Sequence, residues 1–162
     1  MSLVNGQPIL LVEDSPEDYE ATVRSLRRAR LRNPIFHCKD GDSALDYLYQ
    51  RGEYASLSAA PRPGIILLDL NLPGTDGREV LTVVKQDENL KSIPVIILTT
   101  SSDERDIAAC YKAGANSYVT KPVDLDGLFH ALQRLHEFWL EIAVYPSTAI
   151  PPNQNKNNRP IP

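Results

Sequence analysis

Short apolar runs alternate with longer amphipathic segments along the chain. Ile9–Val12, Ile65–Leu68 and Val95–Leu98 are apolar at consecutive positions and are too short for helices. Such runs are typical of parallel strands, because helices cover both faces of the sheet. Two weaker runs, Ile35–Cys38 and Ser117–Val119, complete a set of five predicted strands.

The intervening segments carry helix periodicity and end signals. Ser15 is a suitable N-cap for a first helix, and a second helix begins at Gly41. A third is predicted over about Arg78–Gln86, and a fourth runs from near Asp103 to the residue before Gly114. The resulting alternation of strands and helices predicts an α/β fold with a doubly wound parallel sheet.

The last helix is predicted from an apolar stripe with steps of three and four residues. The stripe consists of Leu125, Leu128, Leu132, Leu135, Trp139 and Ile142. We expect it to face the core. Two further segments lie outside the strand and helix pattern: a long polar connection at 50–64, and a Pro- and Asn-rich end at 146–162 that we expect to be disordered.

Composition excludes several classes of protein. The chain has 162 residues, a net charge of −4 and a pI near 5.4, which argues against a general nucleic-acid binder. The Arg residues between Arg24 and Arg32 are expected to form a solvated face. Since neither a membrane-spanning run nor a signal-peptide profile is present, we expect a cytoplasmic protein. Cys38 and Cys110 lack metal-ligand spacing and are interpreted as reduced structural thiols.

Acidic residues follow two of the predicted strands. Glu13 and Asp14 end the first strand, and Asp69 ends the third. Because ligands gather at the carboxyl ends of parallel strands, these three carboxylates should meet at one edge of the sheet, where their repulsion favours a bound cation. Oxygen ligands favour Mg²⁺, and the backbone carbonyl of Asn71 is a further candidate ligand.

Two other strand ends add a hydroxyl and a cation. Thr99 and Thr100 follow the fourth strand, and Lys121 follows the fifth. Each of the acids alone is more often a turn or helix-cap residue than a site residue, and a lone Lys or Thr at a strand end carries no signal. Together, however, a nucleophilic carboxylate, a metal site, a hydroxyl and an ammonium are the groups that an aspartyl phosphate requires.

Residues 7 to about 143 resemble the receiver domain of two-component response regulators. The matching positions, in the family's order and spacing, are the acidic pair Glu13-Asp14, the phosphoacceptor Asp69, the switch hydroxyl Thr99, the switch aromatic Tyr118 and the family's lysine at Lys121. The resemblance implies a flavodoxin-like receiver fold with strand order 2-1-3-4-5, a receiver domain over residues 1–145, and a Lys121-Pro122 bond of a kind typically cis in the family.

The resemblance also implies a mechanism. A partner histidine kinase would supply the phosphoryl group, and Asp69 would accept it in a reaction that the receiver itself largely catalyses, followed by slow autodephosphorylation. Thr99 and Tyr118 would then move and reshape the surface of the fourth helix, fifth strand and fifth helix. The protein would therefore be a signalling switch rather than a metabolic enzyme.

The connection at 50–64 and the stretch HEFWLEIAVYP at 136–146 resemble the single-domain regulators of cyanobacterial phytochromes. The alternative is a single-domain receiver, or a phosphorelay intermediate, that serves a kinase other than a phytochrome. Output is expected through the receiver's own surface, because about seventeen residues after the last helix are too few for an output domain.

Two other classes share parts of this pattern. A flavodoxin-like electron carrier needs a hydroxyl- and Gly-rich phosphate loop where this chain has Glu13 and Asp14. A haloacid-dehalogenase-type phosphatase needs an acid two residues after its nucleophile, where this chain has Asn71.

Apolar residues off the stripe of the last helix predict a second buried surface. They are Phe129, Phe138, Leu140 and Tyr145. We expect a homodimer through the C-terminal half; the alternative is that these side chains fold back over the first helix or the 50–64 connection.

Overall fold

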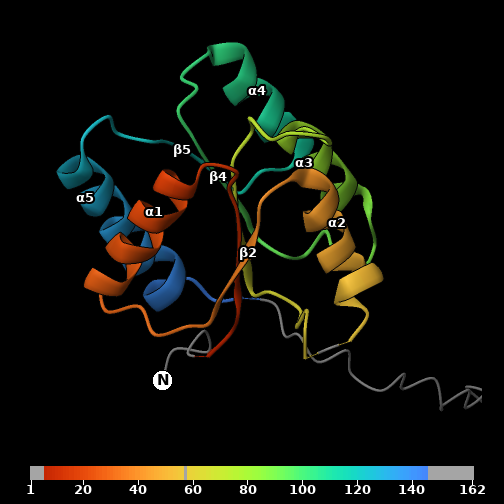
Figure 1. The fold of residues 1–162 in the computed structure, drawn as a ribbon. Helices are drawn as coiled ribbons and strands as arrows, with labels where there is room; N and C mark the ends of the chain where they lie inside the picture. Colours follow the sequence, from red (N-terminus) through yellow and green to blue (C-terminus); the bar gives the residue numbers. More distant parts are fainter. Residues whose placement is uncertain (1–5, 57, 146–162) are drawn as a thin grey trace, which may run out of the picture.

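The computed structural model describes residues 6–56 and 58–145 and contains a five-stranded parallel sheet between two layers of helices (Figure 1). The strands are β1 (Ile9–Val12), β2 (Ile35–Cys38), β3 (Ile65–Leu68), β4 (Val95–Thr99) and β5 (Ser117–Thr120). Their order across the sheet is β2-β1-β3-β4-β5. The predicted strands, including the two weaker ones, and the predicted order are confirmed.

Five α-helices connect and cover the strands. They are α1 (Pro16–Arg28), α2 (Gly41–Tyr49), α3 (Gly77–Gln86), α4 (Glu104–Ala113) and α5 (Leu125–Leu135). Helices α1 and α5 lie on one face of the sheet, and α2, α3 and α4 lie on the other (Figure 1). The predicted helix ends hold: the Ser15 hydroxyl accepts a hydrogen bond from the Asp18 amide, and Gly114 ends α4 at a φ of 108°.

The apolar runs are explained by two cores, one on each side of the sheet. In β1, Leu10 and Val12 pack against α2, α3 and α4, whereas Ile9 and Leu11 pack against α1 and α5. All four side chains are buried. A strand that alternates between two dry faces has no solvent-exposed position, and its sequence is therefore continuously apolar.

The C-terminal helix departs from its predicted form. After Leu135 the chain continues as the π-helix η2 (His136–Ile142), whose wider turn carries the core-facing position from Leu135 to Leu140. Leu128, Leu132 and Leu135 are buried as predicted. Leu125 and Ile142 are instead 71% and 67% exposed, so the prediction that the whole stripe faces the core is wrong at both ends.

The residues predicted to lie off this stripe are divided between core and surface. Leu140 and Tyr145 are buried in the core beneath α1 and α5, and Phe129 packs under the Arg28 guanidinium, 4.0 Å from it. Phe138 remains exposed. Folding back onto the domain therefore accounts for part of this set.

The polar connection at 50–64 packs onto the domain where the structure describes it. It contains the 3₁₀ turn η1 (Gly52–Tyr54), and Ala60 is buried against the core. The Tyr47 hydroxyl donates to the Pro61 carbonyl at 2.7 Å, and the side-chain amide of Gln50 donates to the Ala60 carbonyl at 3.1 Å. These two bonds hold the later part of the segment, at Ala60 and Pro61, against the C-terminal end of α2.

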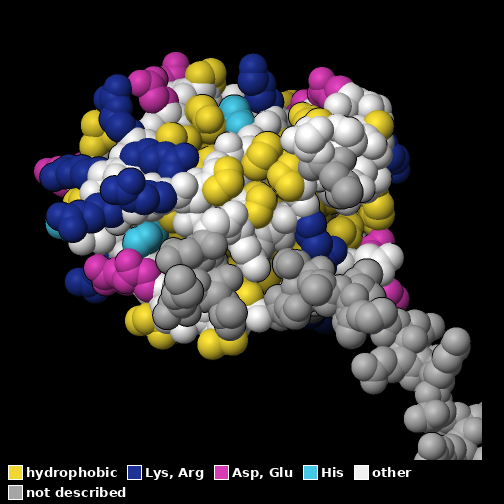
Figure 2. All heavy atoms as spheres, turned by 90° about the horizontal axis from the view of Figure 1, so that it is seen from below, with side chains coloured by type: hydrophobic (Ala, Val, Ile, Leu, Met, Phe, Trp, Pro, Cys, Tyr) yellow, Lys and Arg dark blue, Asp and Glu magenta, His cyan; other side chains and the backbone are white. Residues whose placement is uncertain are grey.

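Basic side chains gather on the side of the molecule that carries α1 and α5 (Figure 2). The Arg residues of α1 and the loop after it are exposed, as predicted: Arg24, Arg27, Arg28, Arg30 and Arg32. None of the helices within 6–56 and 58–145 is long and apolar enough to cross a membrane. The expected disordered end at 146–162 lies outside the described residues.

Candidate functional site

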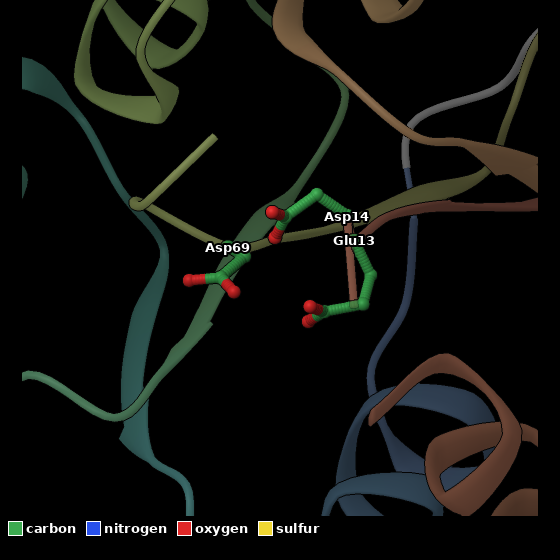
Figure 3. Close-up of side chains that lie close together, drawn as sticks. All are labelled: Glu13, Asp14 and Asp69. Atoms are coloured by element: carbon green, nitrogen blue, oxygen red, sulfur yellow. The ribbon is translucent and has the colours of Figure 1, made fainter. Parts of the chain in front are cut away.

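Three carboxylates converge at the carboxyl edge of the sheet. Glu13 and Asp14 follow β1, and Asp69 follows the neighbouring strand β3. One oxygen from each carboxylate lies within 4.8 Å of the other two, and the side chains point toward a common space (Figure 3). The Asp69 amide donates to the Val12 carbonyl at 3.0 Å, which ties the two strand ends together.

Lys121 joins this cluster from β5. Its ammonium lies 2.5 Å from Glu13, 3.1 Å from Asp18 and 3.3 Å from Asp69. Glu13, Asp69 and Lys121 are buried, whereas Asp14 is exposed. The site therefore has a buried floor with a counter-charge and one acid that faces solvent.

Burial and charge act in opposite directions on this buried pair. Burial raises the pKa of Glu13 to about 7, although the hydrogen bond and charge of Lys121 act to lower it. Burial alone would lower the pKa of Lys121, but its hydrogen bond with Glu13 and the charges of Asp69 and Glu13 outweigh that effect and raise it. Lys121 is therefore charged at neutral pH, and this single ammonium is shared by the carboxyl groups of Glu13, Asp18 and Asp69.

Thr99 lies next to Lys121 at the end of β4. The Lys121 amide donates to the Thr99 carbonyl at 2.7 Å, and the Thr99 hydroxyl accepts a long bond of 3.4 Å from the Ser101 amide. Thr99 is fully buried, whereas Thr100 is exposed. Of the two threonines named from the sequence, only Thr99 is enclosed within the domain.

The loop after Asp69 stays close to the site. The Asn71 amide donates to the Asp69 carboxylate at 3.3 Å, and the Gly77 amide donates to the Leu70 carbonyl at 2.9 Å. A Cβ atom at Gly77 would collide with the backbone oxygen of Asp69, so only glycine permits this close approach.

Tyr118 is half-buried on β5 and is connected to the β4–α4 loop. Its hydroxyl donates to the Ser101 carbonyl at 2.8 Å, and the Ser101 hydroxyl donates to Asp106 at 2.7 Å. Ser101 thus contacts the predicted switch residues Thr99 and Tyr118 as well as α4.

Three residues of this region escaped the sequence-based prediction. Asp18, in the first turn of α1, was not among the residues predicted for the site, yet its carboxylate lies beside the Lys121 ammonium. Ser101 and His37 carried no local signal, because their contacts depend on strands being brought side by side.

The donor set fits a hard divalent cation. Three carboxylates lie within reach of one ion, one of them is open to solvent, and the buried Glu13 has its pKa raised toward neutrality. A cation would favour the ionised form of Glu13 and supply positive charge in addition to that of Lys121.

The peptide bond between Lys121 and Pro122 differs from the expectation. No cis peptide bond occurs among the described residues, so this bond is not in the cis form that is typical of the family.

Comparison with known families decides the assignment. The profile described as "Response regulator receiver domain" matches residues 9–133, which include every site residue named above. The chain belongs to the response regulator receiver family. Receiver domains act as signalling switches, and membership of this family decides against the flavodoxin-like and phosphatase alternatives.

Receiver proteins of phytochrome systems are close relatives of the chain. Response regulator Rcp1 from Synechocystis sp. is 45% identical over 139 residues, which cover 86% of this chain and 92% of Rcp1. The phosphorylated cyanobacterial phytochrome response regulator RcpA superposes with a TM-score of 0.82 at 44% identity, covering 88% of this chain and 99% of RcpA. The Mn²⁺-bound form of Rcp1 gives a TM-score of 0.81 at 44% identity, with 87% and 99% covered.

Proposed function

We propose that Asp69 accepts a phosphoryl group from a phosphohistidine of a partner kinase, with Mg²⁺ held by Glu13, Asp14, Asp69 and the Asn71 carbonyl. The proposal rests on one observation: three carboxylates and an ammonium meet at the strand ends of a receiver domain. An Asp69 oxygen attacks phosphorus, the P–N bond to histidine breaks, and an acyl phosphate forms.

The residues around Asp69 have distinct tasks in this reaction. Mg²⁺, when bound, offsets charge on the phosphoryl oxygens and lowers the repulsion between donor and acceptor. The Lys121 ammonium lies 3.3 Å from Asp69 and would also offset negative charge on the phosphoryl group. The Thr99 hydroxyl then leaves the Ser101 amide for the phosphoryl group, and Tyr118 turns inward. Asp69 would later lose the phosphoryl group slowly to water.

The phosphoacceptor is tested with Asp69→Asn, which removes the nucleophilic oxygen and preserves shape. We expect the full-length variant to take up no hydroxylamine-sensitive phosphate in Mg²⁺, while the parent does. Glu88→Gln is the matched control, because it also removes one negative charge. Glu88 is exposed, and within the described residues its ion pair is with Lys91. Normal phosphate uptake by Asp69→Asn would refute the assignment.

We propose that the partner kinase is a phytochrome, since two similar structures, each 44% identical to the chain, are described as a cyanobacterial phytochrome response regulator (RcpA) and a bacteriophytochrome response regulator (AtBRR). A comparison of phosphoryl transfer rates from a panel of purified histidine kinases tests this. Fastest transfer from a phytochrome supports the proposal, whereas faster transfer from another kinase would favour the alternative receiver or phosphorelay role.

We also propose that the chain forms a homodimer through its C-terminal half. Phe138 and Ile142 of η2 and the adjacent Val144 are exposed apolar side chains on one short stretch. Exposed apolar side chains that gather in this way favour burial in an interface, and a twofold pair would bury the same residues on both copies.

A further inference from the structure

The backbone of Glu13 is held on both sides by the edge strand β2. The Glu13 amide donates to the Cys38 carbonyl at 3.0 Å, which continues the pairing of β1 with β2. The Glu13 carbonyl is 2.7 Å from Nε2 of His37. A carbonyl oxygen only accepts, so Nε2 carries the hydrogen in this bond.

The His37 ring is itself fixed in position. It stacks on the ring of Tyr19 from α1, with the two ring centroids 3.8 Å apart and the planes inclined by 10°. His37 and Tyr19 are both half-buried. A stacked ring loses little additional freedom when it donates a hydrogen bond, so the bond to Glu13 is preorganised.

The bonded carbonyl belongs to the peptide unit that joins Glu13 to Asp14. The Glu13 carboxylate has its own anchors, namely Lys121 and the Ser15 amide at 3.1 Å. The Asp14 side chain is exposed, and the direction in which it leaves the backbone follows from the orientation of this peptide. Whatever fixes the peptide therefore fixes the second acid of the pair.

We propose that His37 is a positioning residue that orients the Glu13–Asp14 peptide, and with it the acidic pair, for a divalent cation. The inference rests on the proposed metal-binding role of Glu13 and Asp14. Mg²⁺ tolerates little deviation from octahedral geometry, so freedom of one ligand lowers affinity. Groups that orient metal ligands typically change affinity about 10–100-fold when removed, and a contact through the backbone should have an effect at or below the lower end.

Two substitutions separate the hydrogen bond from the stacking. His37→Phe keeps a flat ring against Tyr19 and loses the donor, whereas His37→Gln keeps a donor at a similar reach and loses the stacking. We would titrate each full-length protein with Mg²⁺ alone by calorimetry. We would also measure phosphorylation by acetyl phosphate as a function of Mg²⁺ concentration, and unfolding in urea with chelator present.

We expect His37→Phe to weaken Mg²⁺ binding about three- to tenfold. The Mg²⁺ concentration for half-maximal phosphorylation should rise by the same factor. The phosphorylation rate at saturating Mg²⁺ should stay within about twofold of the parent rate. His37→Gln should restore affinity to within about twofold. Parent-like affinity in His37→Phe, or equal weakening in both variants, would overturn the inference.

Glu13→Gln and Asp14→Asn identify the source of a failure. If both abolish the Mg²⁺ response and His37→Phe does not affect it, only the role of His37 is wrong. If Glu13→Gln and Asp14→Asn leave Mg²⁺ binding unchanged, the proposed metal site itself is wrong.

Discussion

Lys121 is the one cation in direct contact with the buried acids Glu13 and Asp69 in the described part of the chain. An ion pair in this environment contributes little net stability while it is intact, because both partners are desolvated. Removing one partner is different, since a buried charge is then left without compensation. Lys121 therefore affects folding as well as phosphoryl chemistry.

We predict that Lys121→Ala lowers the free energy of unfolding by about 2–4 kcal/mol in chelator, and that saturating Mg²⁺ restores part of the loss because a second cation offsets the carboxylates. Lys91→Ala is the control, since Lys91 pairs with Glu88 at the surface and should cost less than about 1 kcal/mol. Urea unfolding measures both. Equal costs for the two variants would contradict an uncompensated buried charge at the site.

Helices α3 and α4 are joined through Arg78. Its guanidinium lies 2.8 Å from Asp106 of α4 and 3.1 Å from Asp76, the N-cap of α3. The Ser101 hydroxyl donates to the same Asp106 carboxylate. The pKa of Asp106 is lowered by its hydrogen bonds from Ser101 and Arg78, so this contact persists across the neutral range.

We predict that Arg78→Ala increases the rate of amide hydrogen exchange in the first turn of α4, including Ile107, while it lowers stability by only about 0.5–1 kcal/mol because the pair is partly exposed. Arg105→Ala is the matched control. Arg105 pairs with Asp103, the N-cap of α4, and forms no ion pair with α3 among the described residues. Exchange that rises equally in both variants would show that α4 frays independently of α3.

The π-helix η2 decides which C-terminal apolar residues belong to the core. With the wide turn, Leu140 is 4% exposed and Ile142 is 67% exposed. A continued α-helix would favour the opposite assignment, because the stripe of steps three and four leads from Leu135 through Trp139 to Ile142.

We predict that Leu140→Ala lowers the free energy of unfolding by about 2–4 kcal/mol, as expected for a leucine removed from a packed core. Ile142→Ala should cost less than about 0.5 kcal/mol, as expected for a surface position. Urea unfolding at low micromolar concentration limits any contribution from association. A larger loss for Ile142→Ala than for Leu140→Ala would indicate that the helix continues with α-helical periodicity.

The proposed dimer uses a smaller surface than the apolar pattern alone predicted. Leu140 and Tyr145 are already buried within the domain, which leaves Phe138, Ile142 and Val144 exposed near the C-terminal end of the described chain. A contact formed by so few apolar side chains should be disrupted by a charged substitution, because burying an unpaired charge in the interface costs free energy of association.

We predict that the full-length protein sediments as a dimer at micromolar concentration, and that the double variant Phe138→Glu and Ile142→Glu sediments as a monomer with urea stability close to the parent. Val123→Glu, at another exposed apolar position, is the control and should remain dimeric. If the parent protein is a monomer both before and after phosphorylation of Asp69, the dimer is excluded.

The five strands, most of the helix ends and the chemical groups of the site follow from the sequence alone. Strands buried on both faces must be apolar at every position, caps such as Ser15 and Gly114 mark helix ends locally, and parallel strands bring the acids after β1 and β3 to one edge. These are local patterns combined with a topological rule, so they could be derived without coordinates.

The contacts among these groups, and the surfaces that stay exposed, depend on how the chain packs in three dimensions. The pairing of Lys121 with Asp18, the bond from His37 to the Glu13 carbonyl and the burial of Leu140 rather than Ile142 had no decisive signal in the sequence. The first two join segments that become neighbours only when the sheet assembles. The third follows from a shift of backbone hydrogen bonding to the wider π turn, which rotates every later side chain without any change in the apolar pattern.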